Sequence, residues 1–203
     1  MQPLPANSVI ERARSQPGPH RDRAFVECHA VALSQTCGEQ HGQQPPGDIS
    51  SVPSGFAAGA GGRILHYDGT KWTLQVSGTT DDLFVIGSLG PNNALAAGTA
   101  GTVLHFDGTS WTFANGGTIE ALGGGTGSPS DLFLVGDGGT ILHSSDAVTW
   151  NAQASGTAND LTAAEEHLFA VGAAGTILHY DGTSWSAQSS PTTVPLNGGD
   201  HRH

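Results

Sequence analysis

The sequence lacks the features that hold many small secreted or membrane proteins together. Its two cysteines, Cys28 and Cys37, both lie near the N-terminus. The remainder therefore has no disulfide framework and no Cys-based zinc site to stabilise it. No apolar run approaches the ~20 residues that cross a bilayer as a helix, so we expect no transmembrane segment. The main region must gain its stability from packing.

Basic residues are also scarce. Seven Lys and Arg stand against 18 Asp and Glu, which gives a net charge of −11, and lysine occurs once, at Lys71. Acids and bases balance in residues 1–47, so the whole excess falls on residues 48–203. A surface of this sign repels phosphate backbones and anionic lipids. We expect no nucleic-acid partner.

The N-terminal 47 residues differ in composition from the rest, since they are rich in Pro, Gln, Ser and Arg. Such a composition buries little apolar surface, so we interpret residues 1–47 as a disordered or processed leader. The apolar run 24–33, followed by Cys37, faintly resembles the end of a bacterial lipoprotein signal. Glu27 and His29 interrupt that run, so there is no clear signal peptide, and a degraded or misassigned export signal stays open.

Glycine and repetition are what the chain has in abundance. Gly accounts for 30 of 203 residues, and four similar segments begin at Gly59, Gly98, Gly136 and Gly172, at spacings of 39, 38 and 36 residues. Each segment contains two glycines three apart, then Leu-His, an Asp and a Trp. A repeat near 40 residues is typical of propeller blades. We divide the chain into blades at about 48–79, 80–117, 118–156 and 157–190, with a tail at 191–203.

Each unit resolves into four short strands separated by turn residues. In the last unit they are expected at 161–164, 168–172, 176–180 and 184–188, with glycine-rich or Asp-Gly hairpin turns between them. Leu178 and Tyr180 would face one side of the sheet, Ile177 and His179 the other. Both faces then need cover. The pattern predicts an all-β fold, a β-propeller of four four-stranded antiparallel blades of about 36–39 residues. A β-solenoid is the alternative, although its coils are usually shorter.

The motif of residues 171–185, Val-Gly-x-x-Gly-Thr-Ile-Leu-His-Tyr-Asp-Gly-Thr-Ser-Trp, resembles the repeats of BNR/Asp-box and photosystem II assembly-factor-like propellers, often grouped with WD40/YVTN repeat-like domains. It is most similar to versions in secreted or lipid-anchored deltaproteobacterial proteins. The segment Ser144–Trp150 comes nearest to an Asp-box, but it is one residue short and lacks the Gly. The resemblance covers about residues 48–190 and implies an extracytoplasmic or cell-surface location.

Two departures from the family weaken its known activities here. Asp-box sialidases bind the substrate carboxylate with an arginine triad, whereas the repeats of this chain contain Arg63 alone. The assembly factors would present arginine-rich surfaces, which this acidic chain lacks. We therefore expect no enzyme activity.

The residues that recur in every unit invite functional readings. A ring of histidines would suit a metal, paired carboxylates a glycosidase, and exposed tryptophans a sugar platform. Recurrence at equivalent strand and turn positions instead favours hydrogen bonding, turn formation and core packing. We expect structural roles and neither metal nor cofactor. The residues are His66, His105, His143, His179, Asp68, Asp107, Asp146, Asp181, Trp72, Trp111, Trp150 and Trp185.

Function is expected where the units differ, at 88–93, the long turn 123–130, and 163–167. These stretches fall between the first and second strands of their blades, on one rim. The candidate binding residues are Ser88, Pro91, Asn92, Asn93, Gly124, Thr126, Ser128, Glu165, Glu166 and His167.

The leading hypothesis is a non-catalytic binding or scaffolding module that recognises a protein or glycan on this rim. One alternative is a glycan-acting hydrolase, with Glu165 or Glu166 as acid and Asp131 as base. Another is a fragment of a larger propeller protein. The ligand, and whether four blades close by themselves or a homodimer completes a larger propeller, stay open.

Overall fold

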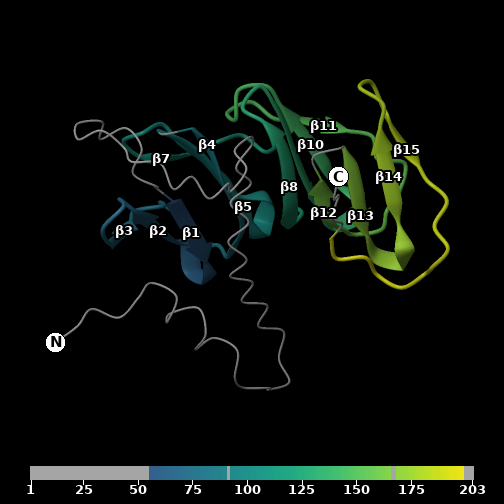
Figure 1. Ribbon diagram of the computed structural model, residues 1–203, viewed down its shortest axis with the longest axis horizontal. Coiled ribbons are helices and arrows are strands. Elements are labelled where there is room, and N and C mark those ends of the chain that lie inside the picture. The colour runs from purple at the N-terminus through teal and green to yellow at the C-terminus, as the bar shows by residue number, and fades with distance from the viewer. Residues whose placement is uncertain (1–54, 91, 166–167, 199–203) are drawn as a thin grey trace, which may run out of the picture.

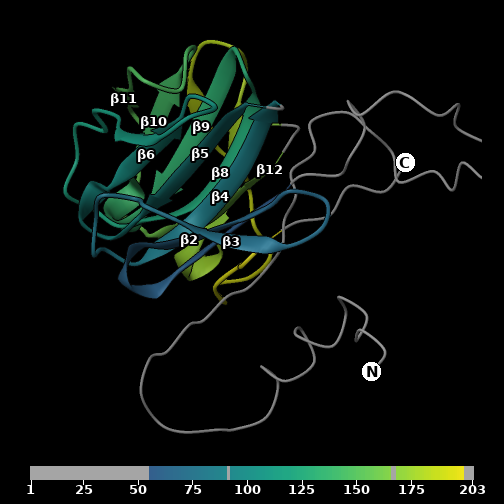
Figure 2. The ribbon, with the colours of Figure 1, turned by 90° about the vertical axis from the view of Figure 1, so that its left-hand side faces the viewer.

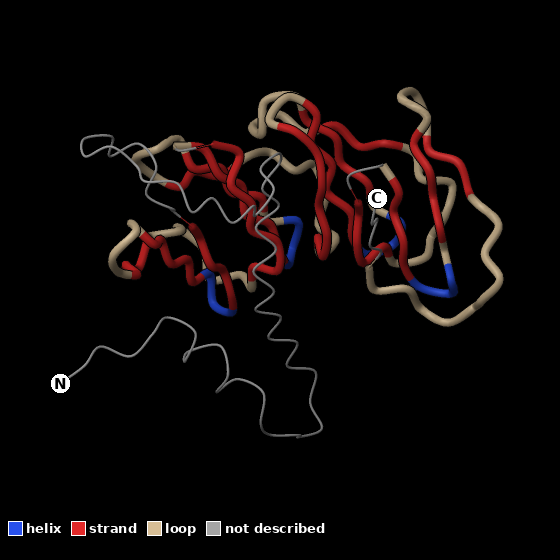
Figure 3. The backbone as a smooth tube through the Cα atoms, viewed as in Figure 1, coloured by secondary structure: helices blue, strands red, loops and turns tan. Residues whose placement is uncertain are grey.

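A computed structural model describes residues 55–90, 92–165 and 168–198, which form four antiparallel β-sheets (Figures 1 and 3). The part of the chain that the structure describes contains no α-helix. Its helical turns are the single 3-10 turns Ala60–Gly62, Thr99–Gly101, Asp137–Gly139 and Ala173–Gly175. The predicted leader, residues 1–47, lies outside the described residues.

Strands follow one another within each sheet in chain order. The first sheet holds β1 (Gly55–Gly59), β2 (Arg63–Tyr67) and β3 (Trp72–Gln75). The second holds β4 (Leu83–Gly90), β5 (Asn93–Gly98), β6 (Val103–Phe106) and β7 (Trp111–Phe113). The third holds β8 (Leu122–Ser128), β9 (Asp131–Gly136), β10 (Ile141–Ser144) and β11 (Asn151–Gln153). The fourth holds β12 (Leu161–Glu165), β13 (Phe169–Gly172), β14 (Ile177–Tyr180) and β15 (Trp185–Ala187).

This arrangement confirms an all-β fold made of antiparallel sheets. The strands expected in the last unit agree with β12 to β15 to within one residue at each end. In the first sheet, β1 occupies the second-strand position, because it pairs with β2 and precedes the same glycine turn as β5, β9 and β13. The first strand expected for that sheet would precede Gly55, outside the described residues.

The expectation of a long turn at residues 123–130 is wrong. Residues Leu122–Ser128 form strand β8, which pairs with β9 from Leu122↔Gly136 to Ser128↔Asp131, so only residues 129 and 130 turn. The glycines in this stretch favoured a turn interpretation. They are needed instead because β8 lies close to its neighbours: a Cβ on Gly124 would come within 2.8 Å of the Ala163 Cα.

Successive sheets pack face to face. Ile64 of the first sheet lies in one core cluster with Leu104 and Trp111 of the second. Val103, on the other face of the second sheet, packs with Leu142 of the third. The third and fourth sheets meet through a further cluster, which contains Phe133, Ile141, Leu178 and Trp185. Each interior sheet is therefore covered on both faces, as its two apolar faces require.

The first strands of the sheets lie side by side at the inside of the stack. Strand β4 contacts β8, and β8 contacts β12 (Figure 2). Each of these three strands has a register irregularity at the same place, after Leu83, Leu122 and Leu161. No comparable contact joins β12 to β1 among the described residues, and the first and fourth sheets lie at opposite ends of the long axis (Figure 1). The described sheets form an open stack.

The glycine turns tie each sheet to the linker that leaves it. The second glycine of each Gly-x-x-Gly has a positive φ, +72° at Gly139, and a Cβ there would collide with the carbonyl oxygen of Thr157 in the linker. The residue before it also has a positive φ, but it is alanine in two sheets, Ala100 and Ala174. Space, rather than φ alone, therefore requires glycine at the second position.

The substitution Gly139→Ala should destabilise the protein by about 3 kcal/mol, because it adds a collision with backbone to the strain of a left-handed residue. The matched control Gly138→Ala should cost about 1 kcal/mol, since its φ is +62° and no atom lies within 4 Å of the new Cβ. Urea unfolding of both variants measures the difference. Equal losses would contradict the collision argument.

Candidate functional site at the hairpin edge

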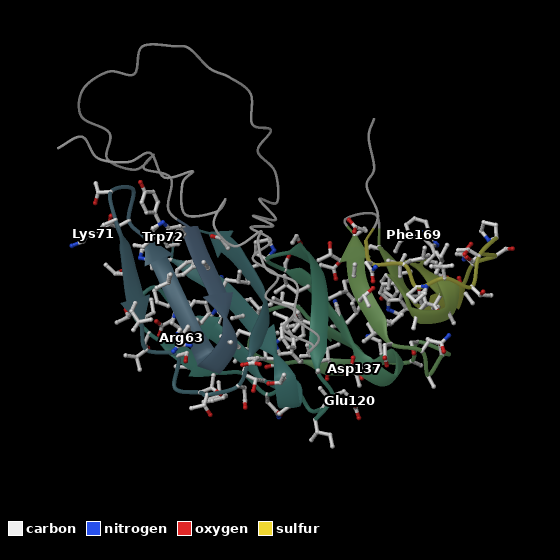
Figure 4. The ribbon with its side chains drawn as sticks, turned by 90° about the horizontal axis from the view of Figure 1, so that it is seen from below. Arg63, Lys71, Trp72, Glu120, Asp137 and Phe169 are labelled. Carbon is white, nitrogen blue, oxygen red and sulfur yellow. The ribbon has the colours of Figure 1, made fainter. Side chains whose placement is uncertain are left out.

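Each sheet has two edges of different composition. One edge, which we call the hairpin edge, carries the turns between first and second strands and between third and fourth strands. The other, the linker edge, carries the glycine turns and the linkers between sheets. Figure 4 shows Glu120 and Asp137 at the linker edge, whereas Lys71 and Phe169 lie toward the opposite edge. The candidate binding residues that the structure describes lie at or beside the hairpin edge, except Gly124, which pairs with Val135 near the linker edge.

The β4–β5 hairpin presents Ser88 and Asn92 as exposed side chains. The Ser88 hydroxyl donates to the Gly90 carbonyl at 3.2 Å, which holds the end of the hairpin. Asn93 is half-buried, with its Oδ1 2.9 Å from His105 Nε2. Pro91 lies outside the described residues. Ser88 and Asn92 are thus the accessible members of this hairpin.

The β8–β9 hairpin differs from what the sequence predicted. Thr126 is buried, so it is not available to a partner, and Gly124 lies against β12. Ser128 is half-buried, and its hydroxyl lies 3.4 Å from that of the exposed Ser130. Sequence reasoning did not include Ser130 among the binding residues, because the whole stretch was interpreted as a turn. Only the strand assignment shows which residues form its tip.

The β12–β13 hairpin is shorter. Glu165 is half-buried, and its carbonyl accepts a hydrogen bond from Leu168 N at 2.8 Å. Leu168 has a φ of +60°, a backbone conformation that costs a non-glycine residue conformational energy, so the turn is tight. Glu166 and His167 lie outside the described residues. The three hairpins therefore differ in length and in exposed chemistry, although they occupy equivalent places in their sheets.

The repeated histidines contact their own sheets. His66 stacks on Phe56 with ring centroids 4.6 Å apart, and His179 lies 4.6 Å from Phe169. His143 packs 4.7 Å from Phe133, and its Nε2 lies 2.7 Å from Asp131 Oδ1. Within the described ranges, no three His, Cys, Asp or Glu side chains come together as a metal site. His66, His143 and His179 each lie against an aromatic ring, whereas His105 pairs with Leu95 and contacts Asn93.

The repeated aspartates bind their own turns. Asp146 Oδ1 accepts hydrogen bonds from the backbone N–H groups of Val148 and Thr149, at 2.9 and 2.7 Å. Asp68 does the same for Thr70 and Lys71, both at 2.9 Å, and also accepts from the Thr70 hydroxyl. Asp107 and Asp181 make the same pair of backbone bonds. A carboxylate that accepts two N–H groups is favoured in its charged form.

These bonds lower the aspartate pKa values. The Thr70 hydroxyl, followed by the backbone N–H of Lys71 and Thr70, lowers the pKa of Asp68 to about 2. The backbone N–H groups of Thr149 and Val148 lower the pKa of Asp146 to about 2. The pKa values of Asp107 and Asp181 are lowered by the corresponding N–H groups.

The tryptophans differ between sheets. Trp111, Trp150 and Trp185 are buried between sheets, whereas Trp72 is 47% exposed, so the expectation of core packing is wrong for Trp72. Its environment differs because the first sheet has no described neighbour on that side. Trp150 Nε1 donates to the Ala147 carbonyl at 3.3 Å. The buried Nε1 atoms of Trp111 and Trp185 have no partner among the described residues.

The linker edge is acidic. Burial, followed by the charges of Asp160 and Glu120, raises the pKa of Asp137. Asp160 accepts a hydrogen bond from Gly138 N at 2.9 Å, and Asp82 accepts one from Gly61 N at 2.8 Å. Shallow depressions of about 600 and 610 Å³ lie beneath the linkers of the second and first sheets. Since both occupy the same repeat position, they are features of the repeat rather than a specific site.

Comparison with known proteins adds no assignment: no protein-family model matches this chain, and no curated protein matches its sequence. Within the described ranges there is also no helix with the length and apolar character needed to span a membrane. The site must therefore be interpreted from its own geometry.

The turn aspartates predict acid sensitivity. Their folded pKa lies below the ordinary value of 3.8, so the stability they contribute is complete above about pH 4 and is lost as the pH falls toward 2. The melting temperature should drop across this window. In the double variant Asp68→Asn, Asp146→Asn the drop should be smaller, because Asn keeps an acceptor oxygen without titrating. Identical melting-temperature profiles would contradict this assignment.

Proposed function

We propose that this chain is a binding or scaffolding module, built as part of a β-propeller, that recognises a protein or glycan partner at its hairpin edge. The observation that carries the proposal is the contrast between the two parts of each repeat. Glycine turns and Asp turns recur in all four sheets and His–aromatic pairs in three of them, whereas the described first hairpins differ from one another. Variable loops on a repeated scaffold are a common place for recognition.

The exposed groups on these hairpins suit hydrogen bonding more than apolar contact. Ser88, Asn92 and Ser130 are small, polar and exposed. Asp131 is exposed beside Ser130 and is paired with His143. Hydroxyl, amide and carboxylate groups can hydrogen-bond sugar hydroxyls or the backbone of a peptide. An extracytoplasmic location, which the family resemblance implies, would suit either ligand.

A hydrolase would need two carboxylates that face each other across the substrate. Asp131, the carboxylate expected as base, already contacts His143 at 2.7 Å within its own sheet. That pairing supports a positioning role within the hairpin edge, so binding without chemistry is the simpler proposal. Turnover of a chromogenic glycoside by the purified protein would favour the hydrolase instead.

The proposal predicts that binding depends on the hairpin tips. The chain should be screened on arrays of defined glycans and of peptides, and the strongest hit titrated by calorimetry. The substitutions Ser88→Arg and Ser130→Arg, both at exposed positions, should each weaken binding at least about tenfold, because the new side chain fills the contact surface.

The matched control is Ile119→Arg, which places the same side chain at an exposed position on the linker edge. It should bind as the parent protein does. Loss of binding in this control with unchanged binding in both hairpin variants would move the site to the linker edge.

A further inference from the structure

We propose that a second copy of this chain covers the open ends of the stack, with the first sheet of one copy packed on the fourth sheet of the other. Two copies joined in this way would form a closed ring of eight sheets. The proposal concerns the end faces, whereas the proposed function concerns the hairpin edge, so each can fail without the other.

The open face of the first sheet carries apolar residues that are buried in every other sheet. Leu65 is 37% exposed, and Trp72 is 47% exposed. The residues in equivalent positions are almost wholly buried, at no more than 8% exposure. They are Leu104, Leu142 and Leu178 for Leu65, and Trp111, Trp150 and Trp185 for Trp72. Exposed apolar groups that a repeat elsewhere buries are typical of an interface.

The fourth sheet ends on the complementary face. Ile177 is half-buried, whereas its equivalents Ile64, Val103 and Ile141 are at most 1% exposed, because the next sheet in the chain covers them. These equivalents pack against the Leu and Trp face of the following sheet in all three internal contacts. The face of the first sheet and the face of the fourth are thus the two halves of a contact that the chain makes three times.

Aromatic geometry repeats in two of these contacts, the one between the first and second sheets and the one between the third and fourth. Phe56, stacked on His66, packs 5.3 Å from Phe106 and 5.4 Å from Trp111. Phe133, beside His143, packs at similar distances from Tyr180 and Trp185, 5.1 and 5.5 Å.

One half of that arrangement is present on the end face of the first sheet. The first sheet presents Tyr67 and Trp72 with centroids 5.2 Å apart at 37°, the same geometry as Tyr180 and Trp185. A copy-to-copy contact would bring this pair against Ile177 of the fourth sheet, as Trp111 lies in one cluster with Ile64.

The segment after the fourth sheet has the form of a linker that leads into another sheet. The Ser190 hydroxyl donates to the Thr192 carbonyl at 3.1 Å, as Ser155 donates to Thr157 in the linker before the fourth sheet. Val194 N donates to Thr192 Oγ1 at 3.0 Å, the bond that Asn159 N makes to Thr157 Oγ1. Each of the three internal linkers has a threonine at the position of Thr192. Four residues after it comes the leucine that begins β4, β8 or β12.

Leu196 occupies that position after the fourth sheet. Its N–H donates to the Gly172 carbonyl at 2.9 Å, and its carbonyl accepts from the Thr162 hydroxyl at 2.6 Å. The chain is thus held against the fourth sheet at the point where the next sheet would start. No strand was expected in this tail, and none forms among its described residues, but its linker geometry points to a neighbour.

A second copy fits this place better than the rest of the chain does. Residues 1–47 and 197–203 contain no Trp and no copy of the repeat motif. Another copy brings the matching Leu65 and Trp72 face. In such a pair each copy donates one end face of each kind, so the same contact forms twice around a two-fold axis. Eight sheets lie within the usual range of four to eight blades for a closed propeller.

The mass in solution tests the proposal. The full chain should sediment at about twice its 20.7 kDa mass. Trp72→Arg and Ile177→Arg, on opposite end faces, should each reduce the mass to that of one chain while far-UV circular dichroism and cooperative melting are retained. Leu65→Arg serves as a second variant of the first face. Ile119→Arg, away from both faces, should leave the mass unchanged.

Mixing the two single-face variants makes the test sharper. In a mixed pair one contact carries both substitutions and the other carries none, so Trp72→Arg with Ile177→Arg should recover a two-chain species that neither forms alone. Dissociation by Trp72→Arg but not by Ile177→Arg would mean that two first sheets meet, and would overturn the proposal. So would a single-chain mass for the parent protein, or a series of larger species, which indicates an open assembly.

Discussion

Every sheet in this protein has two apolar faces, and the contact that covers them is the interaction on which the rest depends. The three internal contacts use the same parts: an aliphatic side chain from the third strand of one sheet meets the Leu and Trp face of the next. The second sheet and the third sheet each take part in two such contacts, which bury both of their faces. A four-stranded sheet with two exposed apolar faces has little stability alone, so each sheet is stabilised mainly by its neighbours.

Much of the fold could be predicted from the sequence, because the same local requirements of turns and strands fix the same residue types in every repeat. The glycine turns are required by a close approach to the linker, as at Gly139, and the aspartates by two backbone N–H groups that each must bind, as at Asp146. Ile177 and Leu178 are adjacent in one strand, so their side chains point to opposite faces of the sheet. Because both are apolar, they indicated that both faces are covered. These are short-range rules, so a single chain was enough to detect them.

The rest could not be predicted, because it depends on context outside the repeat. Trp72 and Trp111 stand in the same motif, yet one is exposed and the other buried, and only the position of their sheets in the stack distinguishes them. Gly124 was interpreted as part of a turn, whereas it allows two adjacent first strands to approach. Thr126 was placed on the rim, but the pleat of β8 turns its side chain inward. Whether sheets close into a ring depends likewise on the sum of the angles between neighbouring sheets, which no local sequence pattern encodes.

Each described sheet packs only on the sheets next to it in the sequence, and this affects how the molecule unfolds. A stack of this kind behaves as a nearly one-dimensional array, in which loss of order at an end costs one interface and loss in the middle costs two. In a single copy, fraying would therefore start at the first and fourth sheets, each of which has one face that no other described sheet covers. Amide hydrogens in the central strands of the interior sheets, β5, β6, β9 and β10, would be the last to exchange with solvent, and proteolysis would shorten the array from its ends.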